Sequence, residues 1–253
     1  MNGLIDTHVH LDFFEAPEDV VERARQQGVT QFIVPGVTPA AWPALLSLTE
    51  SRPDVWIAPG VHPQAAGQWS RQTETDLRTL LRHPRVVAVG EIGLDKQAAC
   101  PIAQQEKVCR QMIALAREHH LPLLLHVRRA TERLLTLLKE EGHDELSGIV
   151  HAFSGSLETA PQFIDLGFSF GLGGVLTYPD AKRLPMVVRQ LPADRLVLES
   201  DAPDMAPHPH RGKPNQPAYL PLVAESLALV RNWSLEHTIE VTTANAKKIF
   251  QLA

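Results

Sequence analysis

The stretch Leu4-Ile5-Asp6-Thr7-His8-Val9-His10 gives the pattern from which the fold can be predicted: a short apolar run that ends in two histidines. Residues i and i+2 of a β-strand lie on the same face, so His8 and His10 would point two imidazoles at one place. Neutral imidazole nitrogens bind divalent metals well. Because four later apolar runs end in a similar way, we predict that this strand end is part of a metal site.

Length and composition restrict the class of protein. The chain has 253 residues with 44% hydrophobic content, which is enough for a single domain over residues 1–253. Barrels of alternating strands and helices commonly have about this length. The formal net charge of -5 leaves no global basic field, so a nucleic acid would have to bind a local patch.

Two features favour a cytoplasmic protein. Cys100 and Cys109 show neither C-x-x-C spacing nor the pattern of a disulfide framework. No apolar run approaches the length of a membrane span, and the N-terminus has the pattern of a strand rather than of a targeting segment. We therefore expect a cytoplasmic protein without membrane contact, and no feature of the sequence indicates an obligate protein partner.

Short apolar runs alternate along the chain with segments in which apolar residues recur every three or four positions. The predicted strands are Gly3–Asp6, Gln31–Pro35, Val55–Pro59, Val86–Gly90, Leu121–Leu125, Gly148–Val150, Phe168–Gly171 and Leu196–Leu198. Strands without polar alternation are typical of parallel sheets covered on both faces. The sequence therefore predicts an α/β fold, a TIM-type (β/α)8 barrel or a seven-stranded relative. The alternative, an open doubly wound sheet, lacks its usual G-x-G-x-x-G after the first strand.

Six residues that commonly bind metals come directly after five of these predicted strands. They are His8, His10, Glu91, His126, His151 and Asp201. The carboxyl ends of all strands open onto one face of a barrel, so we predict that the six converge and hold two divalent ions. Taken singly, His126 also fits a hydrogen-bonded core histidine, and Glu91 a salt-bridge partner. Burying both acids without a cation would be costly, which favours the metal site.

Several of these stretches resemble the signatures of a known family. They are Ile5-Asp6-Thr7-His8-Val9-His10, Gly90-Glu91-Ile92-Gly93-Leu94-Asp95, His151-Ala152-Phe153-Ser154-Gly155-Ser156 and Leu198-Glu199-Ser200-Asp201-Ala202-Pro203. Together they resemble the TatD family of metal-dependent DNases. Gly171-Leu172-Gly173-Gly174-Val175-Leu176-Thr177-Tyr178-Pro179 and Asp201-Ala202-Pro203-Asp204-Met205 resemble its YjjV-like branch. The resemblance continues to Thr243-Ala244-Asn245-Ala246 near the end of the chain.

The resemblance implies a TIM barrel related to the amidohydrolases that hydrolyses phosphodiester bonds of DNA with divalent metals. It also implies that His8, His10 and Asp201 hold the first metal. Glu91 would bridge the two ions, and His126 and His151 would hold the second. An imidazole-rich set suits Zn, Mn, Fe or Ni better than Mg, although the family also works with Mg.

These roles lead to a mechanistic hypothesis. Glu91 would hold both ions, and Asp201 is the candidate general base because it can contact both a metal and the attacking water. The substrate phosphates would be bound by Arg128, Arg211 and Lys213. For each of these cations a solvated loop charge is an equally good interpretation. His62 would line the predicted metal site or contact substrate, or serve as a structural turn residue.

The long segment 201–217 follows the last predicted strand. Its five prolines, among basic residues, exclude a helix or a central strand, so we expect a stiffened loop. Long loops inside a compact domain are often functional.

Three classes of function remain compatible with the sequence. The first is a metal-dependent DNase or phosphodiesterase. The second is a small-molecule hydrolase that acts on a lactone, an amide or a phosphoester, since fold does not determine substrate. The third is a non-catalytic nucleic-acid-binding or protein-binding descendant, which the retained ligand set disfavours.

Overall fold

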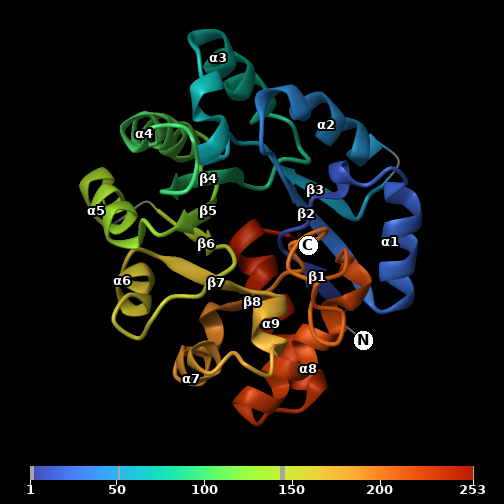
Figure 1. Ribbon diagram of the computed structural model, residues 1–253. Coiled ribbons are helices and arrows are strands. Elements are labelled where there is room, and N and C mark those ends of the chain that lie inside the picture. The colour runs from blue at the N-terminus through green and yellow to red at the C-terminus, as the bar shows by residue number, and fades with distance from the viewer. Residues whose placement is uncertain (1–2, 51, 143–145, 253) are drawn as a thin grey trace. The chain divides into compact units, whose positions relative to one another are not determined.

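The computed structural model describes residues 3–50, 52–142 and 146–252 (Figure 1). Within these residues the strands are β1 Leu4–Asp6, β2 Val29–Pro35, β3 Val55–Ala58, β4 Val89–Asp95, β5 Leu123–Arg128, β6 Gly148–Val150, β7 Phe168–Leu172 and β8 Leu196–Leu198. The α-helices are α1 Pro17–Gln26, α2 Trp42–Glu50, α3 Arg71–Leu80, α4 Ile102–Glu118, α5 Thr131–Glu141, α6 Ala160–Asp165, α7 Arg183–Val188, α8 Leu220–Arg231 and α9 Leu235–Phe250.

This alternation of strands and helices confirms the predicted (β/α)8 fold class in its eight-stranded form. The segment 201–216 contains neither helix nor strand, so the prediction of a loop after the eighth strand is also confirmed.

Six of the eight predicted strands differ from the structure in their bounds, and the fourth and the fifth differ most, by two residues or more at each end. The prediction began the fourth strand at Val86, but Val86 makes only an isolated bridge to Ile57. Instead β4 continues through Glu91, and β5 continues through His126. The two strands stay paired in parallel as far as Asp95 and Arg128. The apolar runs predict strands that end too early, because β4 and β5 continue into polar residues.

The chain forms two compact units. The first takes in Met1–Val34, Ala152–Ala160 and Ser169–Ala253, and the second Pro35–His151 and Pro161–Phe168. The single domain over residues 1–253 stays a prediction, and residues 1–2, 51, 143–145 and 253 lie outside the described residues.

In the first unit the last strand lies beside the first. The Thr7 amide donates to the carbonyl oxygen of Leu198 at 3.0 Å, which joins β1 to β8. On their other sides β1 pairs with β2 and β8 with β7, in both cases in parallel. Helix α9 packs against both β1 and β8. A last strand beside the first is expected of a barrel and not of an open doubly wound sheet.

In the second unit β4, β5 and β6 form consecutive parallel pairs, with α4 and α5 packed beside them (Figure 1). The helical spacing predicted here is confirmed, because the following residues are buried: Val108, Met112, Leu115 and Ala116 in α4, and Leu134, Leu135, Leu137 and Leu138 in α5. These apolar faces pack α4 and α5 against the strands β4 and β5, which carry Glu91 and His126.

Candidate metal centre

Three predicted ligands lie together in the first unit, and we call them the β1–β8 group: His8, His10 and Asp201. One ligand atom from each lies within 4.8 Å of the others. The distance from Asp201 Oδ1 is 3.8 Å to His8 Nε2 and 3.7 Å to His10 Nε2. All three residues are buried. Two imidazoles therefore face one carboxylate oxygen.

Main-chain hydrogen bonds place the members of the β1–β8 group. The Asp201 amide donates to the His8 carbonyl oxygen at 2.9 Å, and the His10 amide donates to that of Ala202 at 2.9 Å. The segments that follow β1 and β8 therefore remain paired beyond the strands themselves. Asp201 has φ 56°, in the left-handed region that aspartate tolerates better than most residues.

Asp6 binds the residue before Asp201, and the sequence did not predict this role. Its Oδ1 accepts the Ser200 amide at 2.9 Å, across 194 positions of the chain. Burial raises the pKa of the Asp6 carboxyl to about 7, although the Ser200 bonds oppose that rise. The available signal was strand alternation, because Asp6 precedes His8 by two residues and shares its face.

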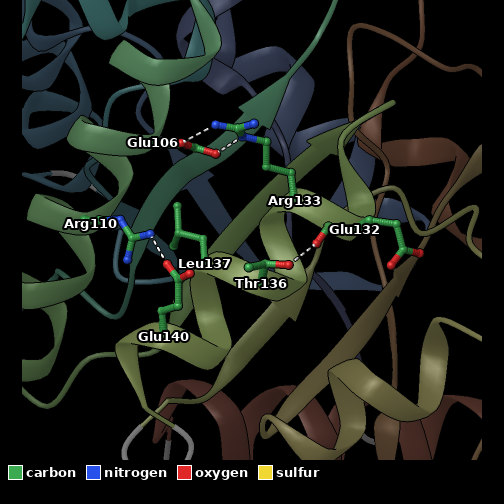
Figure 2. A pocket seen from close by; sticks show the side chains of 7 residues that line it. All are labelled: Glu106, Arg110, Glu132, Arg133, Thr136, Leu137 and Glu140. Carbon is green, nitrogen blue, oxygen red and sulfur yellow. Dashed lines mark hydrogen bonds and ion pairs between the residues drawn. The ribbon is translucent and has the colours of Figure 1, made fainter.

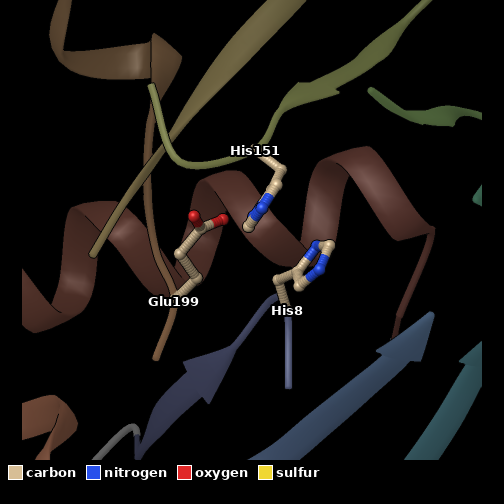
Figure 3. Close-up of side chains that lie close together, drawn as sticks. All are labelled: His8, His151 and Glu199. Carbon is tan, nitrogen blue, oxygen red and sulfur yellow. The ribbon is translucent and has the colours of Figure 1, made fainter. Parts of the chain in front are cut away.

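Glu199 is a second acid of the first unit that the sequence analysis did not select. It follows β8 directly along the chain, and His8 lies two residues after the end of β1. Figure 3 shows both side chains; the third labelled residue, His151, belongs to the second unit. A carboxylate oxygen of Glu199 and a ring nitrogen of His8 lie within 4.8 Å. Glu199 Oε1 accepts the Ala152 amide at 2.6 Å.

The Glu199 carboxylate also explains a glycine. A Cβ on Gly171 of β7 would overlap the Glu199 carboxylate, so only glycine leaves it room. Glu199 is buried, and its position directly after the apolar run of β8 was the signal that could have selected it. It is a further candidate for binding or orienting a ligand beside His8.

The second unit contains another cluster, the Glu91 group: His62, Glu91 and His126. Their ligand atoms lie within 4.8 Å of one another. Glu91 Oε1 is 2.7 Å from His126 Nδ1 and 3.8 Å from His62 Nε2. His151 Nε2 is 3.7 Å from the same oxygen. One buried carboxylate oxygen therefore faces three imidazoles.

His62 was predicted only to line the site, contact substrate or form a turn, but it lies within 4.8 Å of two predicted metal ligands. Its Nδ1 accepts the Gln64 amide at 3.2 Å, so the proton of the neutral ring is on Nε2, which faces Glu91. Burial lowers the pKa of His62 to about 4, against the opposing effect of Glu91. The ring is therefore neutral at pH 7.

Asp95, at the end of β4, completes the surroundings of His126. Its Oδ2 is 3.5 Å from His126 Nε2. The sequence analysis quoted Asp95 in a family signature but gave it no role. It lies four residues after Glu91 in the same strand and is paired with Arg128 of β5.

Both groups suit a divalent cation. Each combines imidazole nitrogens with a buried carboxylate, the donor set that zinc, manganese, iron and nickel accept. A buried carboxylate is stabilised when a cation neutralises it. That all six predicted ligands share one centre stays a prediction.

The predicted phosphate-binding cations differ in their surroundings. Arg128 is exposed at the end of β5, two residues beyond His126. Arg211 Nη1 is 2.6 Å from Asp180 Oδ1, and its guanidinium stacks 4.1 Å from the centre of the Tyr178 ring. Lys213 is exposed in the Pro-rich loop. Their contact with substrate stays a prediction.

A pocket of about 420 Å³ in the second unit has a different chemistry (Figure 2). It lies between α4 and α5, and no histidine lines it. Ion pairs join Arg133 to Glu106 and Arg110 to Glu140 across it. Because these charges already neutralise one another, we assign the pocket a structural role in joining the two helices.

Comparison with known proteins identifies the family. A family model described as TatD related DNase matches residues 5–251. The chain belongs to this family. Several of its relatives carry the name metal-dependent hydrolase.

Two relatives and one solved structure of TatD proteins illustrate this similarity. The uncharacterized metal-dependent hydrolase YabD of Bacillus subtilis (strain 168) is 38% identical over 98% of this chain and 99% of its own. A protein of Rahnella sp. (strain Y9602) named 3'-5' ssDNA/RNA exonuclease TatD is 37% identical, over 92% of each chain. The crystal structure of YjjV, a TatD homologue from Escherichia coli K12, is 34% identical with a TM-score of 0.93, over 99% of this chain and 98% of its own.

Proposed function

We propose that this TatD protein is a divalent-metal-dependent hydrolase that cleaves phosphodiester bonds of DNA. The observation that carries the proposal is the pair of clusters in which histidines surround a buried carboxylate, the β1–β8 group and the Glu91 group. The name of the Rahnella relative, an ssDNA/RNA exonuclease, supports a nucleic acid as the substrate.

The two groups would hold two divalent ions, of Zn, Mn, Mg, Fe or Ni. His8, His10 and Asp201 would bind one ion. Glu91, His126 and His151 would bind the other. His62 Nε2 lies 3.8 Å from Glu91 Oε1, which supports a place for His62 beside this second ion. There it would act as a neutral hydrogen-bond donor rather than as a charged group.

The chain's own residues would share the chemistry as follows. A bound divalent ion supplies Lewis acidity, which acidifies water and polarises a phosphoryl oxygen. Asp201 would accept the proton of the attacking water, because its Oδ1 faces the site beside two imidazoles. The neutral His62 ring would donate a hydrogen bond from its Nε2–H, and it would add no charge to the site near pH 7.

Substrate binding would involve the cations and one aromatic ring. Arg128, Arg211 and Lys213 would contact phosphate oxygens, for which the planar guanidinium is well suited. Phe13 is 53% exposed, and its ring stacks on that of His10 with 4.9 Å between centroids. An exposed ring beside a candidate ligand supports a substrate with bases, since bases stack on aromatic side chains.

A small-molecule phosphoester hydrolase is the second candidate. The pairing of Arg211 with Asp180 favours it, because a cation that is already neutralised attracts a polyanion less strongly. The formal net charge of -5 acts in the same direction. A small phosphoester would need the two metal groups but no extended basic surface.

The proposed setting is the cytoplasm. Cys100 and Cys109 are both free thiols, as expected of a protein in a reducing compartment. None of the helices in the described part of the chain is both long and apolar enough to cross a membrane.

The test compares substrates in parallel. The purified protein is incubated with Mn²⁺ and either 3'-labelled or 5'-labelled single-stranded DNA, and separately with a panel of small phosphoesters and carboxylic esters. We expect cleavage of DNA that a chelator abolishes and that added Mn²⁺ restores. Turnover of small esters alone would replace the DNase proposal with the second candidate, and turnover of neither would overturn both.

A further inference from the structure

A buried amide holds the loop that carries Asp201. Asn215 lies in the segment 201–217 and is only 1% exposed. Its Nδ2 donates to the carbonyl oxygens of Ser200 and Asp204, each at 2.7 Å. These two residues stand on either side of Asp201. We propose that Asn215 is a positioning residue for Asp201, an inference that rests on the hydrolase function proposed above.

The main chain closes the same turn. The Asn215 amide donates to the Pro203 carbonyl oxygen at 2.9 Å, and the Asp204 amide donates to that of Asp201 at 2.8 Å. Asp201 itself has φ 56°, a conformation that persists only where the surroundings hold it. The Asn215 side chain supplies two of the bonds that do so.

Asp6 binds the other main-chain polar group of Ser200. The Ser200 amide donates to Asp6 Oδ1 at 2.9 Å, while its carbonyl accepts from Asn215 at 2.7 Å. The next residue, Asp201, donates to the His8 carbonyl oxygen at 2.9 Å. With the peptides on both sides of Ser200 hydrogen-bonded, the main chain that carries the Asp201 carboxylate beside His8 and His10 is held in place.

Asparagine suits this position because its Nδ2 carries two N–H donors, one for each carbonyl oxygen. Aspartate would instead set a carboxylate against two carbonyl oxygens, and alanine would leave both carbonyls buried without these bonds. Residues that orient metal ligands in this way commonly change metal affinity about 10–100-fold when they are replaced.

The chain contains a matched control at the other end of β8. Asn245 of α9 is 9% exposed, and its Nδ2 donates to the carbonyl oxygens of Ala193 and Leu196, each at 2.8 Å. The chemistry is the same, but these bonds hold the beginning of the strand. Replacing Asn245 therefore reports the cost of losing two such bonds without disturbing the turn at Asp201.

The experiment measures Mn²⁺ binding to the full chain by electron paramagnetic resonance, after removal of resident metal. The wild type, Asn215→Ala and Asn245→Ala are compared, and His10→Ala identifies the binding phase that belongs to the β1–β8 group. We expect Asn215→Ala to raise the Kd of that phase at least tenfold and to leave any other phase within twofold. Asn245→Ala should leave all phases within twofold.

Unfolding by urea is measured on the same metal-free samples. Both alanine variants should lose stability, because each loses two buried hydrogen bonds. If Asn215→Ala does not yield folded protein, Asn215→Ser takes its place, since its short hydroxyl cannot reach both carbonyls. The proposal is overturned if the folded Asn215 variant binds Mn²⁺ as the wild type does, or if Asn245→Ala weakens the same phase equally.

The outcome separates this inference from the function it rests on. Wild-type protein that binds Mn²⁺ through the β1–β8 group but cleaves no phosphodiester contradicts the proposed function alone. Wild-type protein that cleaves DNA while the Asn215 variant keeps its Mn²⁺ affinity contradicts the positioning role alone.

Discussion

The two histidine–carboxylate groups are built in different ways. In the β1–β8 group the main chain places the ligands, through bonds such as that from the Asp201 amide to the His8 carbonyl oxygen at 2.9 Å. Asp201 Oδ1 lies 3.8 Å from His8 Nε2 and 3.7 Å from His10 Nε2. In the Glu91 group the main chain also contributes, as in the bond from the His62 amide to the Val37 carbonyl oxygen at 2.9 Å. In addition, a side-chain contact joins two members directly, since Glu91 Oε1 lies 2.7 Å from His126 Nδ1.

The difference indicates how each group would respond to change. Removing the Asp201 side chain leaves the main-chain bonds around His8 and His10 in place. Removing the Glu91 side chain takes away the group that three imidazoles face. Loss of the carboxylate should therefore disturb the histidines more in the Glu91 group, where it lies 2.7 Å from His126, than in the β1–β8 group.

The largest expected effect comes from the two carboxylates. Asp201→Ala and Glu91→Ala should each lower kcat for phosphodiester cleavage by about 10²–10⁴-fold, the usual contribution of such groups. Steady-state kinetics and metal content by mass spectrometry are measured together. Asp194→Ala, at an exposed acid in the first unit, is the control and should keep the wild-type rate. Wild-type rates with full metal content in either ligand variant would contradict the assignment.

Chelation should lower stability through both groups. An ion at 100 times its Kd stabilises the folded state by about 2.7 kcal/mol. For a protein of this size that corresponds to a shift in Tm of roughly 5–10 °C per ion. Thermal unfolding with and without a chelator measures it. In Asp201→Ala only the shift from the Glu91 group should remain, and a full wild-type shift would show that Asp201 binds no ion.

The Glu91 group should also make metal-free protein sensitive to acid. The pKa of His62 is lowered to about 4, below the 6.5 of an unfolded chain, so the unfolded state binds more protons between these values. Stability should therefore fall as the pH drops from 6.5 toward 4, by roughly 2–3 kcal/mol at about 1.4 kcal/mol per pH unit.

Urea unfolding of the wild type and His62→Gln from pH 7 to pH 4.5, with a chelator present, isolates this effect. Asp6, with a pKa raised to about 7, has the opposite pH dependence, but it is common to both proteins and cancels in their difference. Parallel curves for the two proteins would contradict the lowered pKa of His62.

The smallest expected effect concerns the loop beside the β1–β8 group. Arg211→Ala should weaken binding of single-stranded DNA and reduce the slope of log K against log salt by about one. Arg189→Ala, at another exposed arginine of the first unit, is the control and should keep the wild-type slope. An unchanged slope for Arg211→Ala would remove Arg211 from phosphate binding.

The sequence predicted the fold class well because apolar runs and helical spacing depend on neighbouring residues. It selected His8, His10 and Asp201 for the same reason, since each follows an apolar strand. The end of β4 was predicted wrongly because the prediction followed the apolar run, whereas the strand continues through the polar residues Glu91 and Asp95.

Contacts between distant residues were beyond the sequence. The bond from the Ser200 amide to Asp6 spans 194 positions, and that from Asn215 to Ser200 spans 15. No local periodicity predicts either bond. The first forms only when β1 and β8 lie side by side, and the second only when the segment after β8 folds back on itself. The same holds for His62, whose position beside Glu91 depends on the packing of the second unit.

The most direct test of the central claim is anomalous diffraction at the manganese edge from crystals grown with Mn²⁺. We predict two peaks, one within about 2.3 Å of ligand atoms of His8, His10 and Asp201, and one at similar distances from Glu91 and His126. Peaks bound by other residues, or none at these two groups, would contradict the account.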